Sequence, residues 1–174
     1  LVRVAEAKPL ADAGLGDLVM RALLLLALLV ACQSSFAVVY INCGCSNNGD
    51  GTGKQCADYA SGPGAKNVAV TTVSASTEYS YAAGSTCTLA STSVTVNQNA
   101  VSISKYGDGV RPRINGGSAS YALSVTTSNG FSITGVDWGN GVTGAVNLSA
   151  TTTGGVFSNN AINSSLVGIA ISAA

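Results

Sequence analysis

Histidine is absent from the 174-residue sequence, and charged residues are scarce. Asp, Glu, Lys and Arg together make up 9% of the chain, and its net charge is zero. Without histidine, the chain offers no Ser/His/Asp triad, no histidine-ligated zinc site and no imidazole base. It also lacks a basic run that could bind nucleic-acid phosphates, so we predict no nucleic-acid partner. Any catalysis would depend on carboxylates, lysine, arginine or tyrosine.

Long hydrophobic stretches are missing, with one exception. Met20 and Arg21 precede ten consecutive apolar residues, 22–31. As a helix this run would be about 15 Å long, roughly half the thickness of a bilayer core. It therefore predicts a signal-peptide helix over residues 20–37, the alternative being a short amphipathic helix packed on the domain. Residues 1–19 do not fit such a signal, and we interpret them as translated upstream sequence or a wrongly chosen start.

Two cleavage sites compete at the end of this signal. Small residues at Ser35 and Ala37 suit ordinary signal peptidase, and we favour this site, which leaves a mature chain from Val38. The alternative is Leu-Val-Ala-Cys, ending at Cys32, which resembles the bacterial lipobox and makes Cys32 a candidate for lipidation. Both predict a protein that is secreted or held at the cell surface or outer membrane of a bacterium. Membrane contact is expected only through the signal peptide or a lipid on Cys32.

Four further cysteines follow the signal: Cys43, Cys45, Cys56 and Cys87. In an oxidising compartment, four cysteines predict two disulfides, with three possible connectivities. We expect Cys43 and Cys45 to tie the first strand to a loop at Cys56 and to a strand or turn at Cys87. Their spacing lacks the paired C-x-x-C units of a zinc module, so we predict no metal site.

The rest of the chain is rich in Ser, Thr, Val, Ala, Asn and Gly, and it repeats. Alternating apolar pairs recur at intervals of 22, 23 and 23 residues, at Val101/Ile103, Leu123/Val125, Val146/Leu148 and Ile169/Ile171. A second series recurs after 24 residues, from Ile133, Val136 and Trp138 to Phe157, Asn160 and Ile162. Each repeat therefore holds at least two short strands separated by turns.

Coils of 22–24 residues with several short strands predict an all-β parallel β-helix, in which equivalent strands pair at about 4.8 Å. The frame of a leucine-rich repeat is missing, and the blades of a β-propeller are longer. Asn159, Asn160 and Asn163 are expected at the bends, because asparagine tolerates left-handed backbone conformations.

The stretch VSISKYGDGVRPRINGG, residues 101–117, is similar to a segment near the start of right-handed parallel β-helix proteins of the pectate-lyase-like superfamily. NGFSITGVDWGNG and TGGVFSNNAINSS resemble coil segments of that superfamily, and VYINCGCSNNGDGTG resembles its first strand and loop. The resemblance implies a right-handed fold with an N-terminal cap and first strands over residues 38–100. Coils follow over 101–174, and because the last ends on an apolar strand, we expect the natural protein to continue.

The resemblance implies a carbohydrate-active protein of the polysaccharide lyase or glycosidase type, with a polysaccharide or cell-surface glycan as partner. Lyases of this kind use Arg or Lys as a base with calcium, and hydrolases use grouped aspartates. The few acids of the mature chain do not fall one coil apart on a common face, so no catalytic residues can be assigned and no cofactor is visible. Calcium is expected only in a longer protein, and this chain alone is predicted to be inactive. The alternative is a non-catalytic adhesin or structural solenoid.

Four residues are candidates for carbohydrate binding. Asp137 beside Trp138 combines a carboxylate with an aromatic platform, although Trp138 also fits the apolar positions of the second series. Arg111 and Arg113 flank a proline and would contact an acidic sugar, the alternative being that they pair with Asp108 or are solvated.

Two segments earlier in the chain resemble known binding motifs only in part. Lys54 follows a glycine-rich stretch that lacks the full phosphate-binding frame, so no nucleotide site is predicted. Asn47, Asn48 and Asp50 are interpreted as a turn rather than a calcium loop.

Overall fold

The computed structural model describes residues 36–149, 152–164 and 166–172, and this part of the chain contains thirteen strands and no helix. No helix long and apolar enough to cross a membrane occurs among these residues. The predicted signal helix, the upstream segment and Cys32 lie outside the described residues.

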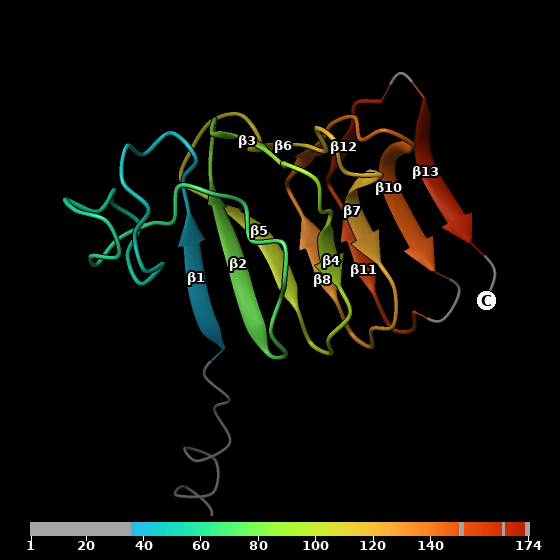
Figure 1. Ribbon diagram of the computed structural model, residues 1–174. Coiled ribbons are helices and arrows are strands. Elements are labelled where there is room, and N and C mark those ends of the chain that lie inside the picture. The colour runs from blue at the N-terminus through green and yellow to red at the C-terminus, as the bar shows by residue number, and fades with distance from the viewer. Residues whose placement is uncertain (1–35, 150–151, 165, 173–174) are drawn as a thin grey trace, which may run out of the picture. The chain divides into compact units, whose positions relative to one another are not determined.

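The strands stack as a parallel β-solenoid of four coils with three strands each (Figure 1). The first coil contains β2 (Thr77–Ala82), β3 (Thr86–Thr88) and β4 (Val94–Val96), and the second contains β5 (Ser102–Tyr106), β6 (Arg113–Asn115) and β7 (Tyr121–Val125). The third contains β8 (Ser132–Thr134), β9 (Asp137–Trp138) and β10 (Gly144–Ser149), and the fourth contains β11 (Val156–Ser158), β12 (Ala161–Ile162) and β13 (Val167–Ser172). The predicted all-β parallel solenoid is confirmed.

Equivalent strands of successive coils form three parallel sheets. Sheet 1 has the order β1-β2-β5-β8-β11, in which β1 (Ala37–Ile41) precedes the first coil. Sheet 2 has the order β3-β6-β9-β12, and sheet 3 has the order β4-β7-β10-β13. Three coils follow Val101, as the repeat predicts, and one complete coil precedes them.

Most of the predicted register is confirmed. Leu123, Val146 and Ile169 align in sheet 3, and the second series aligns through the pairs Ile133/Phe157 and Trp138/Ile162.

The pair Val101/Ile103 was wrongly placed in the first series. Ile103 lies in sheet 1, where it pairs with Tyr79 and Ile133, and the true predecessors of Leu123 and Val125 are Val94 and Val96. The reason is the loop 107–112 in the second coil. It lengthens the interval from Val94 to Leu123 to 29 residues, so these two residues do not share the constant period of the later coils.

The core consists of the inward-facing residues of all three sheets. Alternate residues of a strand point to opposite faces, so the apolar residues that point inward from each strand lie beside their equivalents in the next coil. Ile103, Ile114, Leu123, Ile133 and Trp138 are fully buried. Trp138 therefore packs in the core, as its place in the second apolar series indicated, and a ligand at the surface cannot reach its ring.

A cap over residues 42–76 covers the N-terminal end of the solenoid. The disulfide Cys43–Cys87 joins it to β3, and Cys45–Cys56 closes a loop within it, with Cα–Cα distances of 5.3 and 5.4 Å. The prediction of two disulfides among these four cysteines is confirmed, and their presence is consistent with an extracellular protein.

Two tyrosines of β2 also hold the cap. The backbone N–H of Ser74 donates to the hydroxyl oxygen of Tyr79 at 2.7 Å, and the backbone of Val70 hydrogen-bonds to the Tyr81 hydroxyl. Tyr81 is 1% exposed, and this burial raises its pKa well above the ordinary value of 10.0.

Alkaline pH is therefore expected to destabilise the fold through Tyr81. Between pH 10 and the raised pKa, the unfolded chain loses the proton while the folded chain keeps it, so stability falls by up to about 1.4 kcal/mol per pH unit. Urea unfolding at pH 8 and pH 11 should show this loss. It should be smaller in Tyr81→Phe, whereas Tyr59→Phe, which alters a 63% exposed ring, should behave like the wild type. An identical pH dependence in Tyr81→Phe would contradict the assignment.

Candidate glycan-binding groove

A column of equivalent residues crosses sheet 2 at the start of each strand. Thr86, Arg113, Asp137 and Ala161 pair successively in register, one from each coil. Together with Gly84, Ser85, Val110 and Arg111, they line a groove of about 340 Å³. Three of the four predicted binding residues thus meet in one place, and only Trp138 lies elsewhere.

Strand alternation explains why Asp137 and Trp138 separate. They are consecutive residues of β9, so their side chains point to opposite faces of sheet 2. Trp138 points into the core, and Asp137 points outward into the groove. The predicted pairing of a carboxylate with an aromatic platform therefore does not form.

Arg113 and Asp137 form the charged centre of the groove. The Nη1 atom of Arg113 lies 4.0 Å from Oδ2 of Asp137, and Nε donates a hydrogen bond to Oδ1 of Asn115 at 2.9 Å. The other carboxylate oxygen of Asp137, Oδ1, is buried and has no hydrogen-bond partner among the described residues. This oxygen is enclosed, whereas the Asp137 side chain as a whole is 20% exposed and lines the groove.

Arg111 reaches across two coils at the same groove. Its Nε and Nη2 atoms donate to the backbone oxygen and to Oδ1 of Asn159 at 2.9 and 2.7 Å. Asn159 has a φ of 51°, so its predicted left-handed bend is confirmed. Arg111 thus has Asn159 as its partner, and Arg113 has Asn115 and Asp137, rather than Asp108, whose pairing with these arginines was one alternative.

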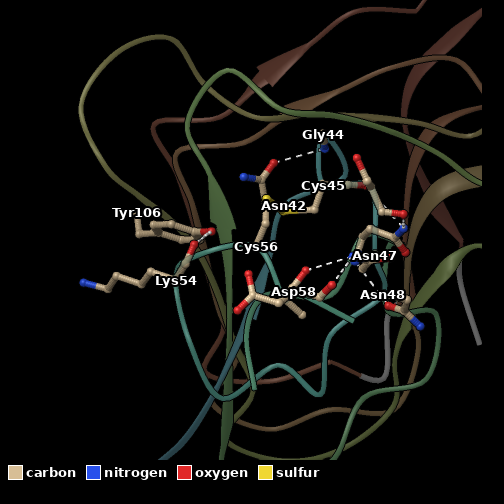
Figure 2. The surroundings of a disulfide bond; sticks show 12 residues. Asn42, Gly44, Cys45, Asn47, Asn48, Lys54, Cys56, Asp58 and Tyr106 are labelled. Carbon is tan, nitrogen blue, oxygen red and sulfur yellow. Dashed lines mark hydrogen bonds between the residues drawn. A yellow bond between two sulfur atoms is a disulfide. The ribbon is translucent and has the colours of Figure 1, made fainter. Parts of the chain in front are cut away.

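The segment with Asn47, Asn48 and Asp50 forms a hydrogen-bonded loop, in which Nδ2 of Asn47 donates to the carbonyl oxygens of Ala57 and Asp58 at 3.1 and 2.9 Å (Figure 2). Oδ1 of Asp50 accepts hydrogen bonds from both the backbone N–H and the hydroxyl of Thr52, and from the N–H of Gly64. These bonds, chiefly that from the Thr52 N–H, lower the pKa of Asp50. Among the described residues, no three His, Cys, Asp or Glu side chains cluster in a way that could hold a metal ion.

An aromatic contact joins β1 to the second coil, and Lys54 of the cap packs beside it. The rings of Tyr40 and Tyr106 meet edge to face at 5.4 Å, and the Lys54 ammonium lies 5.6 Å from the Tyr40 ring centre. The Tyr106 hydroxyl donates to the Lys54 carbonyl at 3.1 Å (Figure 2). Sequence patterns did not indicate this contact, because the two tyrosines lie in strands that are far apart in the chain. Lys54 thus contacts the Tyr40 ring through its ammonium group and Tyr106 through its backbone carbonyl.

Sequence reasoning also missed Ser85 and Thr86 in the groove. The first coil does not follow the constant interval of the later coils, so the sequence did not indicate that β3 would lie beside β6. The alternating pair Val94/Val96 could have indicated the first coil, if the interval between equivalent residues were allowed to be longer than in the later coils.

Comparison with known proteins found no matching family model, no similar curated protein and no similar solved structure.

Proposed function

We propose that this chain is part of an exported protein of the right-handed, pectate-lyase-like type and that its groove on sheet 2 binds an acidic polysaccharide. The observation that carries the proposal is the convergence of Arg111, Arg113 and Asp137 on one groove. A polymer of uronic acids has the complementary groups, because each unit carries a carboxylate and several hydroxyls.

Each groove residue has a distinct role in this proposal. The guanidinium groups of Arg111 and Arg113 pair with sugar carboxylates, for which their planar donors are well suited. Asp137, whose side chain is 20% exposed, accepts a sugar hydroxyl at Oδ2, the oxygen nearer Arg113. The exposed Thr86 extends the groove towards the first coil, so a linear chain can lie along the solenoid axis across successive coils.

The groove supports binding rather than cleavage. Glycoside hydrolysis requires two carboxyl groups about 5–10 Å apart, and Asp137 is the only acid among the groove residues. Lyases of the resembling type also use calcium, and no group of acidic side chains that could hold it occurs among the described residues. We therefore expect no release of reducing ends or unsaturated products from pectin or alginate by this chain.

Arg113→Gln is expected to weaken binding of an oligogalacturonate by about tenfold or more. A hydrogen bond to a charged group contributes about 1.5–3 kcal/mol, and each 1.4 kcal/mol corresponds to a factor of ten in affinity. Isothermal titration calorimetry on the wild type and the variant would measure the change. The matched control is Lys54→Gln, which removes one positive charge outside the groove and should bind like the wild type.

Neutral oligosaccharides provide the second control for this experiment. Oligomers without carboxylates should bind much more weakly than oligogalacturonate to the wild type. Equal binding of acidic and neutral oligomers, or equal affinity of Arg113→Gln and the wild type, would contradict the proposal.

A structural or adhesive solenoid is the second candidate function. Ser80 and Ser104 form a hydroxyl pair at 3.1 Å across two coils on the outer face of sheet 1, and Ser104 donates to Glu78 at 2.7 Å. Such polar ladders stabilise regular coils without any ligand. A folded protein that binds no acidic glycan would favour this function.

A further inference from the structure

The two arginines of the groove are held by different coils. Arg113 of the second coil bonds to Asn115 in its own strand, and its Nη1 atom lies 4.0 Å from Asp137 of the third coil. Arg111 instead donates two hydrogen bonds to Asn159, which follows β11 in the fourth coil. These partners place the two guanidinium groups at different levels along the solenoid axis, on which successive coils are about 4.8 Å apart.

The register of sheet 2 explains how Arg111 reaches the fourth coil. Arg111, Gly135 and Asn159 each lie two residues before a member of the column that crosses the groove. They therefore occupy equivalent places in three successive coils. The middle place is a glycine and has no side chain, and the guanidinium of Arg111 bonds to the residue two coils away.

The backbone of Arg111 is also fixed, because the loop 107–112 is tied at two points. Nζ of Lys105 donates to the carbonyl oxygen of Gly109 at 2.8 Å. The backbone N–H of Gly84 donates to the carbonyl oxygen of Val110 at 3.0 Å. The loop holds one end of the Arg111 side chain, and the fourth coil holds the other.

The two guanidinium groups differ in how far their charge is offset. The partners of Arg111 are an amide oxygen and a backbone oxygen of Asn159, which carry no net charge. The Nη1 atom of Arg111 has no hydrogen-bond partner among the described residues. Arg113 has the Asp137 carboxylate nearby, and its side chain is 39% exposed. Each arginine thus retains donors for one carboxylate, and Arg111 is the stronger site.

A linear uronate chain along the axis matches this arrangement. Each unit of an extended 1,4-linked chain advances it by roughly the rise of one coil, so different units meet Arg111 and Arg113. A unit between them faces Asp137, which repels a carboxylate and accepts a hydroxyl. Once one carboxylate is bound, the second contact is intramolecular, which raises the affinity of the linked chain above that of a single sugar.

We propose that the groove recognises two carboxylates of the same chain, one at Arg111 and one at Arg113, and that Asn159 is the positioning residue that sets their separation. This inference rests on the proposed binding of acidic polysaccharide. It narrows the ligand to a run of three or more linked uronates, and a single uronic acid binds poorly.

Isothermal titration calorimetry with galacturonate and trigalacturonate would test the two-point contact. The wild type should bind the trimer at least about tenfold more tightly than the monomer. Arg111→Gln should bring the affinity for the trimer close to that for the monomer. Lys54→Gln is the matched control, because it removes one positive charge outside the groove and should keep the wild-type preference.

Asn159→Gly tests the positioning role separately. Glycine adopts the φ of 51° at this position without strain, so the variant should fold, and circular dichroism would verify this. It should lower the affinity for the trimer several-fold and leave that for the monomer unchanged. In a protein that already carries Arg111→Gln it should have no further effect, because Asn159 acts through that arginine. The matched control is Asn163→Gly, which alters an exposed asparagine of the fourth coil outside the groove lining.

The outcomes separate this inference from the proposed function. Equal affinity for monomer and trimer in a wild type whose binding depends on Arg113 would overturn the two-point contact and leave the proposed function standing. Unchanged trimer affinity in a folded Asn159→Gly variant would overturn the positioning role. If neither ligand binds to the wild type, the inference and the proposed function both fail.

Discussion

Replacing both Cys43 and Cys87 with serine is expected to lower the free energy of unfolding by about 4 kcal/mol. The bond spans 44 residues, and closure of a loop of that length removes about this much conformational free energy from the unfolded chain. Urea unfolding followed by circular dichroism would measure it.

The double variant Cys45→Ser, Cys56→Ser is the matched control for loop length. Its bond spans 11 residues, for which the same relation predicts a loss of about 3 kcal/mol. It should also leave the fastening of the cap to β3 intact. If removal of the short-loop disulfide destabilises the protein more than removal of the long-loop disulfide, the entropic argument fails.

The parallel solenoid could be predicted because its coils repeat apolar residues at a nearly constant interval. Leu123, Val146 and Ile169 occupy equivalent positions, so the sequence carries the register directly. The prediction misplaced Ile103 because alternating apolar residues occur in more than one sheet and look alike in sequence. Only pairing in space separates these sheets once a loop such as 107–112 changes the interval.

The sequence indicated most of the residues of the candidate site, but it did not indicate how these residues are arranged in space. Arg113 and Asp137 are suggestive on chemical grounds alone, yet their contact depends on the pairing of β6 with β9. The orientation of Asp137 and Trp138 follows from strand alternation, which assigns them to opposite faces. The contribution of Thr86 was not predicted, because the first coil is separated from the second by a longer interval than the later coils are from each other.

Trp138→Ala is expected to destabilise the protein by about 3–5 kcal/mol. The ring is fully buried between its equivalents in the neighbouring coils, Ile114 and Ile162, and its removal leaves a cavity that the rigid ladders cannot close. The wild type and the variant can be compared by the midpoint of urea unfolding.

Trp138→Phe is the variant that distinguishes packing from any polar role of this ring. The indole Nε1 is buried and has no hydrogen-bond partner among the described residues, so phenylalanine removes an unsatisfied donor at the same time as it removes volume. These effects oppose each other, since an unsatisfied buried donor costs about 1–3 kcal/mol. Trp138→Phe should therefore retain most of the stability and all of the oligogalacturonate affinity. Loss of affinity in a folded Trp138→Phe variant would instead place this tryptophan in the binding site. It would contradict the conclusion that Asp137 faces the groove while Trp138 faces the core, on opposite faces of β9.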